Sequence, residues 1–197
     1  IFSVSNVLIQ SSINSFGSIA MAGSTASANV EGFVYNAMNA VYQTALSFTS
    51  QNYGAGKMKR VTKILLYCLG LVVMVGIVMG GGAVLLGPKL LQIYSSDPEV
   101  ISYGMMRMRI INGSYFLCGI MDTMVGGLRG LGYSVIPMLV SLTGACLFRV
   151  VWIFSVFAMH RTLTTLYISY PVSWIITFTA HIICYIVIRK RDRKSVV

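Results

Sequence analysis

The chain has 197 residues, of which 56% are hydrophobic and 10% are charged, with a mean hydropathy of +0.76 and a formal net charge of +10. A soluble domain carries about a quarter charged residues, so this composition excludes a soluble domain. Because the sequence also contains several apolar runs of about 20 residues, it predicts an all-α membrane protein in the lipid bilayer. The basic residues lie at helix ends and not in a stripe interleaved with aromatic residues, which excludes nucleic acid as a partner.

We expect a bundle of six transmembrane helices at residues 1–22, 27–51, 61–87, 98–128, 134–158 and 165–188, together forming one domain at 1–188. The second helix ends at the turn Tyr53-Gly54-Ala55-Gly56, and the fourth begins at Ser96-Asp97-Pro98-Glu99, with Ser96 as its cap. Glycines in the third helix are expected to let helix backbones approach closely. Because the chain begins inside an apolar run without Met, we expect it to be a fragment of a longer protein.

The distribution of basic residues predicts the orientation of the helices. They gather in the loop after the second helix, in the turn after the fourth, and in the tail at 189–197. Loops rich in Lys and Arg stay on the cytoplasmic side, so we expect a cytoplasmic tail. On the outer side, we expect Arg107 and Arg109 to mark the end of the fourth helix. An aromatic belt is expected there from Trp152, Tyr167, Tyr170 and Trp174.

Carboxamide side chains form one stripe on each of the first two helices. The first stripe contains Asn6, Gln10 and Asn14, and the second contains Asn29, Asn36, Asn39 and Gln43. A polar group that faces lipid without a partner costs several kcal/mol. The stripes therefore face a water-filled cavity, which is our main interpretation, or they join helices by hydrogen bonds.

Asp122 is the one carboxylate predicted to lie well inside the hydrocarbon region, on a helix face shared with Tyr115, Cys118 and Arg129. Because desolvation disfavours a bare carboxylate, such a group binds a proton or a small cation such as Na⁺. The alternative is a structural salt bridge or a hydrogen bond to an amide.

Three other ionisable residues lie within the predicted helices. Arg149 is expected about 12 Å further out than Asp122, which favours a partner in an absent part of the protein or an interfacial position. Glu31 either reaches the interface or takes part in ion coupling. His181 is expected to be an interfacial side chain.

No pattern typical of an enzyme or of a cofactor site is found. The chain has two histidines, and its four cysteines are scattered through apolar runs without a CxxC pair. Neither an HExxH motif nor the spacing of a phosphate-binding loop is present. We therefore expect no enzymatic activity, no cofactor and no tightly bound metal.

Two segments resemble the multidrug and toxic compound extrusion (MATE) transporters. The first is Gln51-Asn52-Tyr53-Gly54-Ala55-Gly56-Lys57. The second runs from Met121-Asp122 through Gly126-Gly127-Leu128-Arg129-Gly130-Leu131-Gly132 to Pro137-Met138, with Arg149 further on. The resemblance covers essentially the whole chain, and it implies the C-terminal six-helix lobe of a twelve-helix transporter.

The resemblance also implies a function. MATE transporters export cationic and amphipathic drugs in exchange for Na⁺ or H⁺, and Asp122 is similar to a cation-site residue of the sodium-linked branch. The family's acidic residue on the seventh helix is replaced by Phe2 or Ser3, and its tyrosine one turn before the aspartate by Cys118. The expected partners are such drugs, the lipid bilayer and the missing N-terminal lobe. The expected location is the inner membrane of a bacterium.

Two other functions are compatible with the sequence. One is a flippase of lipid-linked saccharides from the same superfamily, which would need cationic groups in the cavity to hold a pyrophosphate. The other is a membrane scaffold that transports nothing, whose carboxamide stripes would be dry and buried against protein.

Overall fold

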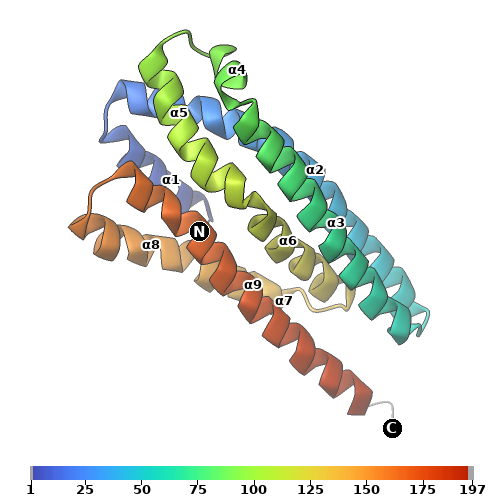
Figure 1. Ribbon diagram of the computed structural model, residues 1–197. Helices are drawn as coiled ribbons and strands as arrows, with labels where there is room; N and C mark the ends of the chain where they lie inside the picture. Colours follow the sequence, from blue (N-terminus) through green and yellow to red (C-terminus); the bar gives the residue numbers. More distant parts are fainter. Residues whose placement is uncertain (1, 195–197) are drawn as a thin grey trace.

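The computed structural model describes residues 2–194, with the side chains of residues 5–191, and this part of the chain is helical without a strand. Figure 1 shows the helices as a bundle in which α2 and α3 form a long antiparallel pair. The α-helices are α1 (Phe2–Asn14), α2 (Ser18–Gly54), α3 (Met58–Leu85), α4 (Gly87–Gln92), α5 (Pro98–Ile111), α6 (Tyr115–Gly130), α7 (Val135–Ser141), α8 (Phe148–Trp152) and α9 (Leu163–Lys194). Phe2, Ser3 and residues 195–197 lie outside the described side chains.

The expected boundary between the first two helices, at residues 23–26, is wrong. The chain turns at Gly17 instead, which has a φ of 99° that L side chains rarely adopt. Residues 23–26 lie inside α2, where Gly23 faces the backbone of α5: a Cβ there would stand 2.5 Å from the Val100 carbonyl oxygen. The small residues that resembled a turn therefore form a close helix contact.

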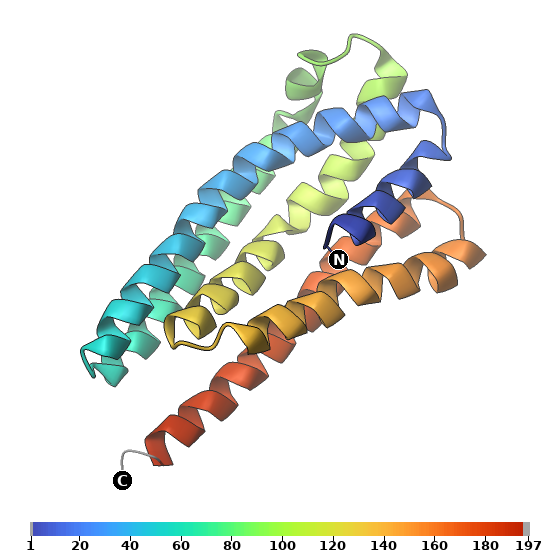
Figure 2. The ribbon, with the colours of Figure 1, turned by 180° about the vertical axis from the view of Figure 1, so that it is seen from behind.

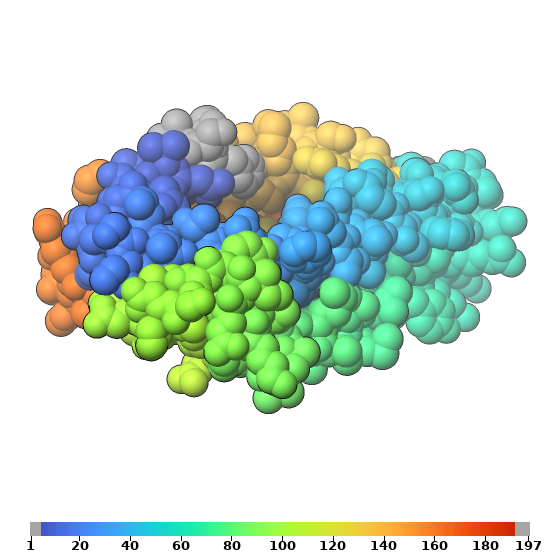
Figure 3. Space-filling view, turned by 90° about the horizontal axis from the view of Figure 1, so that it is seen from above, coloured from blue at the N-terminus to red at the C-terminus, as the bar shows by residue number. Residues whose placement is uncertain are grey.

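Helix α2 packs along α3, α5 and α6, and α9 packs along α6 and α5. Figure 2 shows α1 between α2 and the α7–α8 segment. In the view from above, the start of α2 lies beside the green α4–α5 segment (Figure 3). The expected close approach at glycines holds for Gly76 and Gly80, where a Cβ would meet Phe116 and Asn112 of the neighbouring segment. The same small-xxx-small spacing recurs at Gly126 and Gly130 of α6, against α2.

The expected continuous helices at 98–128 and 134–158 are interrupted. A 3₁₀ turn at Asn112–Ser114 separates α5 from α6, and the Ser114 hydroxyl donates to the Ile110 carbonyl at 2.6 Å. Two π-helical segments, Leu142–Leu147 and Ile153–Phe157, flank α8. In the first, the Thr143 hydroxyl donates to the carbonyls of Leu139 and Val140. Hydroxyl groups that bond to preceding carbonyls often bend helices.

Three helix ends also differ from the prediction. Asp97, not Ser96, caps α5, since its side chain accepts a hydrogen bond from the Glu99 amide at 2.8 Å. The short helix α4 follows α3 as a separate element. The expected tail is helical up to Lys194, because α9 continues through the basic segment.

Three helical stretches among the described residues are long and apolar enough to cross a membrane: Met58–Leu85, Val135–Phe157 and Leu163–Arg191. The described chain is thus an all-helical protein with apolar stretches suited to a bilayer. Helix α2 is long enough, at 37 residues, but its carboxamide stripe makes it more polar.

Candidate functional site

A pocket of about 310 Å³, which we call the Asp122 pocket, lies between α2, α6 and α7. Helix α6 contributes Asp122, and α2 contributes two tyrosines and an asparagine one turn apart. The lining residues are Tyr35, Asn39, Tyr42, Met121, Asp122, Val125, Arg129, Met138 and Ser141. Its polar lining consists mainly of oxygen-bearing side chains around one carboxylate.

The Asp122 carboxylate is partly buried, and no described residue donates a hydrogen bond to it. Arg129 lines the same pocket two turns along α6, but its Nη1 donates to the Tyr42 hydroxyl at 2.9 Å. No described group of three His, Cys, Asp or Glu side chains could hold a metal ion. A carboxylate with hydroxyl and amide oxygens nearby is instead the donor set that suits a hard cation or a proton.

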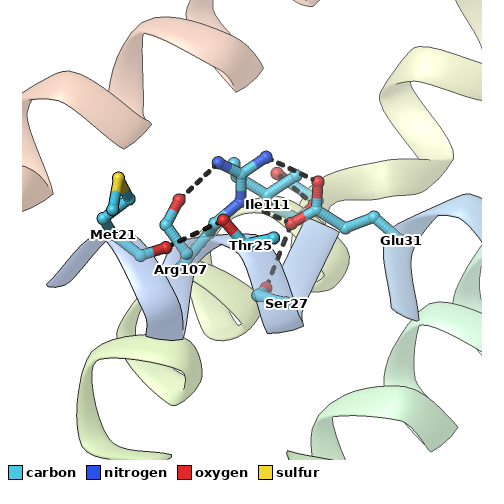
Figure 4. Close-up of polar contacts among 8 residues, drawn as sticks. Met21, Thr25, Ser27, Glu31, Arg107 and Ile111 are labelled. Atoms are coloured by element: carbon cyan, nitrogen blue, oxygen red, sulfur yellow. Dashed lines mark hydrogen bonds and ion pairs between the residues drawn. The ribbon is translucent and has the colours of Figure 1, made fainter. Parts of the chain in front are cut away.

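Glu31 and Arg107 form a buried ion pair, the one ion pair within the described part of the chain. Arg107 Nε donates to Glu31 Oε1 at 2.8 Å, and Nη2 donates to Oε2 at 2.9 Å. Figure 4 shows the guanidinium facing the carboxylate, with Ser27 donating to Oε1 at 3.1 Å. Ser24 accepts a hydrogen bond from Arg107 Nη1 at 2.9 Å.

This network corrects two predictions. Neither Glu31 nor Arg107 lies at an interface, because each is only 7% exposed. A charge at such depth needs a partner, and each residue provides the other's. Arg109, two positions further along α5, is exposed.

A second pocket of about 370 Å³, which we call the α1–α2 pocket, adjoins the ion pair. Its walls come from α1, α2, α5 and α9, and its residues are Asn6, Ile9, Gln10, Ile13, Ser24, Thr25, Ala28, Asn29, Arg107 and Tyr170. The carboxamides of both helices therefore meet across one space. Seven of the ten lining residues carry a polar or charged group.

The carboxamide stripes are open along most of their length. Asn39 is half-buried, and the other six predicted stripe residues are exposed within the described part of the chain: Asn6, Gln10, Asn14, Asn29, Asn36 and Gln43. Gln10 donates to Asn14 at 3.0 Å, along the surface of α1. Asn39 lines the Asp122 pocket, whereas Asn14, Asn36 and Gln43 line neither pocket.

Arg149 lies against an aromatic cluster and is not paired with Asp122. Its guanidinium carbon is 4.1 Å from the centre of the Tyr170 ring and 5.9 Å from that of Trp174. Its Nε donates to the Ser173 hydroxyl at 3.0 Å. Tyr115, a predicted secondary site residue, packs on Trp174 with ring centres 5.5 Å apart. Arg149 is thus already the cation that these aromatic rings contact.

The cluster also corrects the predicted aromatic belt. Tyr167 and Trp174 are buried, at 0% and 3% exposure. Trp152 donates from Nε1 to the Thr165 carbonyl at 3.0 Å. These rings hold α8 and α9 together instead of facing lipid headgroups.

His181 is fully buried between α7 and α9, and not interfacial as predicted. Its Nε2 lies 3.3 Å from the Pro137 carbonyl oxygen and 3.5 Å from the Ser141 hydroxyl. Since the carbonyl can only accept, the proton is assigned to Nε2. The histidine therefore joins α9 to the α7 segment that lines the Asp122 pocket.

The sequence matches the MatE family over residues 1–155. The chain belongs to the MatE family. Members of this family are membrane transporters that act as efflux pumps or flippases, and not as enzymes. The match includes α1–α8, and thus Asp122, Glu31, Arg107 and Arg149. A search of curated proteins found no match for the chain.

Sequence reasoning missed Arg107 as the partner of Glu31. One signal was available: Arg107 lies between Met105, Met106 and Met108, and Glu31 is isolated among small and apolar residues of α2. Ser24, Ser27 and Glu31 are spaced three and four apart, which places them on one helix face. An isolated acid and an isolated base in apolar helices indicate a pair.

Proposed function

We propose that this chain is the C-terminal half of a secondary active multidrug efflux transporter, which exports cationic and amphipathic compounds in exchange for Na⁺ or H⁺. The observation that carries the proposal is the state of Asp122. It is a partly buried carboxylate without a described hydrogen-bond donor, in a pocket with hydroxyl and amide oxygens. We assign it the role of coupling carboxylate.

The other charged groups in the apolar interior support this assignment. Glu31 and Arg107 neutralise each other, and Arg149 is engaged by Tyr170 and Ser173. An ion drives a conformational change only if it binds the two states with different affinity. Asp122 can gain or lose a cation without breaking a described ion pair, so its charge is the one available for exchange.

In this arrangement six spans would cross the membrane: α2, the α5–α6 segment, the three apolar stretches, and a span of which the 13 residues of α1 form a part. Helix α2, at 37 residues, is about 55 Å long and exceeds a hydrocarbon core of about 30 Å. Its open stripe would face water and the N-terminal lobe. We place the protein in the inner membrane of a bacterium, with the basic end of α9 in the cytoplasm.

The stripes would line the substrate path. Their exposure within this lobe supports a cavity over hydrogen-bonded contacts between its own helices. A flippase of lipid-linked saccharides is less well supported, because the buried Arg107 and the half-buried Arg149 already have partners. Efflux of cationic compounds needs no free guanidinium.

The test uses the full-length transporter in proteoliposomes with an imposed Na⁺ or pH gradient and a fluorescent lipophilic cation as cargo. Asp122→Asn keeps the shape of the side chain and removes its charge, so we expect gradient-driven transport to fall to the background of empty vesicles. Glu99→Gln makes the same change on an exposed residue outside the pocket, and transport should be retained. Unchanged coupled transport by Asp122→Asn would show that Asp122 is not the coupling group.

A further inference from the structure

Two segments far apart in the sequence bring basic residues to one end of the lobe. Residues 57–63 begin α3 and residues 189–194 end α9, and together they hold nine of the chain's 15 basic residues and one acidic residue, Asp192. Figures 1 and 2 both show the α2–α3 turn and the end of α9 at the same end of the bundle. We call the described members the basic patch: Lys57, Lys59, Arg60, Lys63, Arg189, Lys190 and Arg191.

Arg189 joins the two segments. Its Nη2 donates to the Met58 carbonyl at 3.1 Å and to the Thr62 hydroxyl at 3.3 Å. Beneath this contact, Val61 and Ile188 belong to a small apolar cluster with Leu128 and Leu131, and all four are at most 5% exposed. The cations of the patch are therefore carried by helix ends that are fixed relative to each other.

Among the described side chains, no acidic residue forms an ion pair with the patch. All of its members except the half-buried Arg189 are exposed, and the one ion pair in the described chain lies elsewhere, at Glu31 and Arg107. Seven cations in one place attract an anion, and guanidinium groups bind phosphate oxygens in a two-pronged geometry. The partner is thus rich in phosphate or carboxylate groups.

The position of the patch identifies the source of the anion. Two of the apolar stretches, Met58–Leu85 and Leu163–Arg191, have one end at the patch. Six helical residues rise about 9 Å, while a headgroup layer is about 5–8 Å thick on each side of the hydrocarbon core. With these stretches across the hydrocarbon core, the basic ends of α3 and α9 would lie at the depth of the lipid phosphates.

We propose that the basic patch is a binding site for the headgroups of anionic phospholipids. The lipid phosphate would be held between the first turn of α3 and the last turns of α9, so that it holds the two helix ends together. A basic residue close to an anionic membrane surface strengthens binding about five-fold. Three of these residues together account for roughly 100-fold in affinity.

The test measures lipid binding and not transport, so it is independent of the efflux proposal. Purified full-length transporter in neutral detergent is titrated with phosphatidylglycerol or with phosphatidylcholine of the same acyl chains, and the melting temperature is recorded. The first variant, Lys59→Gln/Arg60→Gln/Lys63→Gln, removes three exposed cations of the patch. The control, Lys89→Gln/Arg109→Gln/Arg161→Gln, removes three exposed cations outside it.

Phosphatidylglycerol should raise the melting temperature of the wild type and the control at a low mole fraction, whereas the patch variant should need about 100-fold more. Phosphatidylcholine should have little effect on all three proteins. An equal response of the patch variant and the wild type would overturn the proposal. Soluble glycerol phosphate serves as a further arm: stabilisation equal to that by the lipid would mean that the patch binds free phosphate esters instead.

Discussion

Removal of one member of the Glu31–Arg107 pair should destabilise the transporter far more than removal of both. The pair has two charge-assisted hydrogen bonds of 2.8 and 2.9 Å, and both side chains are only 9% exposed. Glu31→Leu leaves the guanidinium with the Ser24 hydroxyl and the rings of Tyr167 and Tyr170, which lie 5.6 and 5.9 Å away. A buried charge that loses its partner costs about 3–5 kcal/mol.

The reverse change, Arg107→Met, leaves the Glu31 carboxylate with the Ser27 hydroxyl as its described donor. We expect a similar loss of about 3–5 kcal/mol. In the double variant no charge is left, and an apolar pair of similar volume is often neutral or stabilising. The double variant should therefore be more stable than either single variant, with a coupling energy of at least about 3 kcal/mol in a double-mutant cycle.

The assay is the free energy of unfolding of the full-length transporter in mixed micelles, titrated with a denaturing detergent. Circular dichroism and the fluorescence of Trp152 and Trp174 report the transition. Additive losses in the double variant would refute the reasoning, because two independent contacts would then explain the data. Losses below about 1 kcal/mol in both single variants would mean that water reaches the pair and screens it.

Two further predictions concern helix packing and water access. Gly23→Val should destabilise the protein by several kcal/mol, because its Cβ would stand within 3 Å of α5. A Cβ at Gly32 of the same helix meets nothing within 4 Å, so Gly32→Val should change the stability by no more than about 1 kcal/mol. Thermal unfolding of the two variants measures the difference. If the stripe faces a cavity, Asn36→Cys in the full-length transporter should react with a water-soluble maleimide. The variant is made in a Cys184→Ser background, which removes the one native cysteine of this chain that is not buried. Protection in every condition would favour a dry contact with the other lobe.

The helical class and the approximate position of the apolar helices were predictable from the sequence, because lipid requires long uncharged runs. The interruptions were not. Hydroxyl groups at Ser114 and Thr143 redirect carbonyl hydrogen bonds, and the same residues also occur inside regular helices. At Gly17 and Gly23 the sequence shows two glycines, of which one turns the chain and the other permits a helix contact. Only the tertiary arrangement distinguishes them.

Part of the candidate site was also predictable from the sequence. Asp122 stands out because an isolated carboxylate in an apolar run is costly, and its pocket contains the predicted stripe residue Asn39. Arg149 was predicted not to pair with Asp122, and no such pair exists among the described residues. Its aromatic partners come from α9, which follows α8 only after the π-helical segment Ile153–Phe157 and a turn. The exact register across these irregular segments cannot be derived from periodicity.

The buried and half-buried charges of the bundle fall into two kinds, and the difference bears on the proposed coupling. Glu31, Arg107 and Arg149 are each held by two or more described partners, so a change in their charge would disrupt the packing of α2, α5, α8 and α9. Asp122 has no described donor and faces a pocket whose walls come from three different helices. A cation bound there would contact α2, α6 and α7 together, and its affinity would depend on their relative positions, which is the condition for linking ion binding to a change of state.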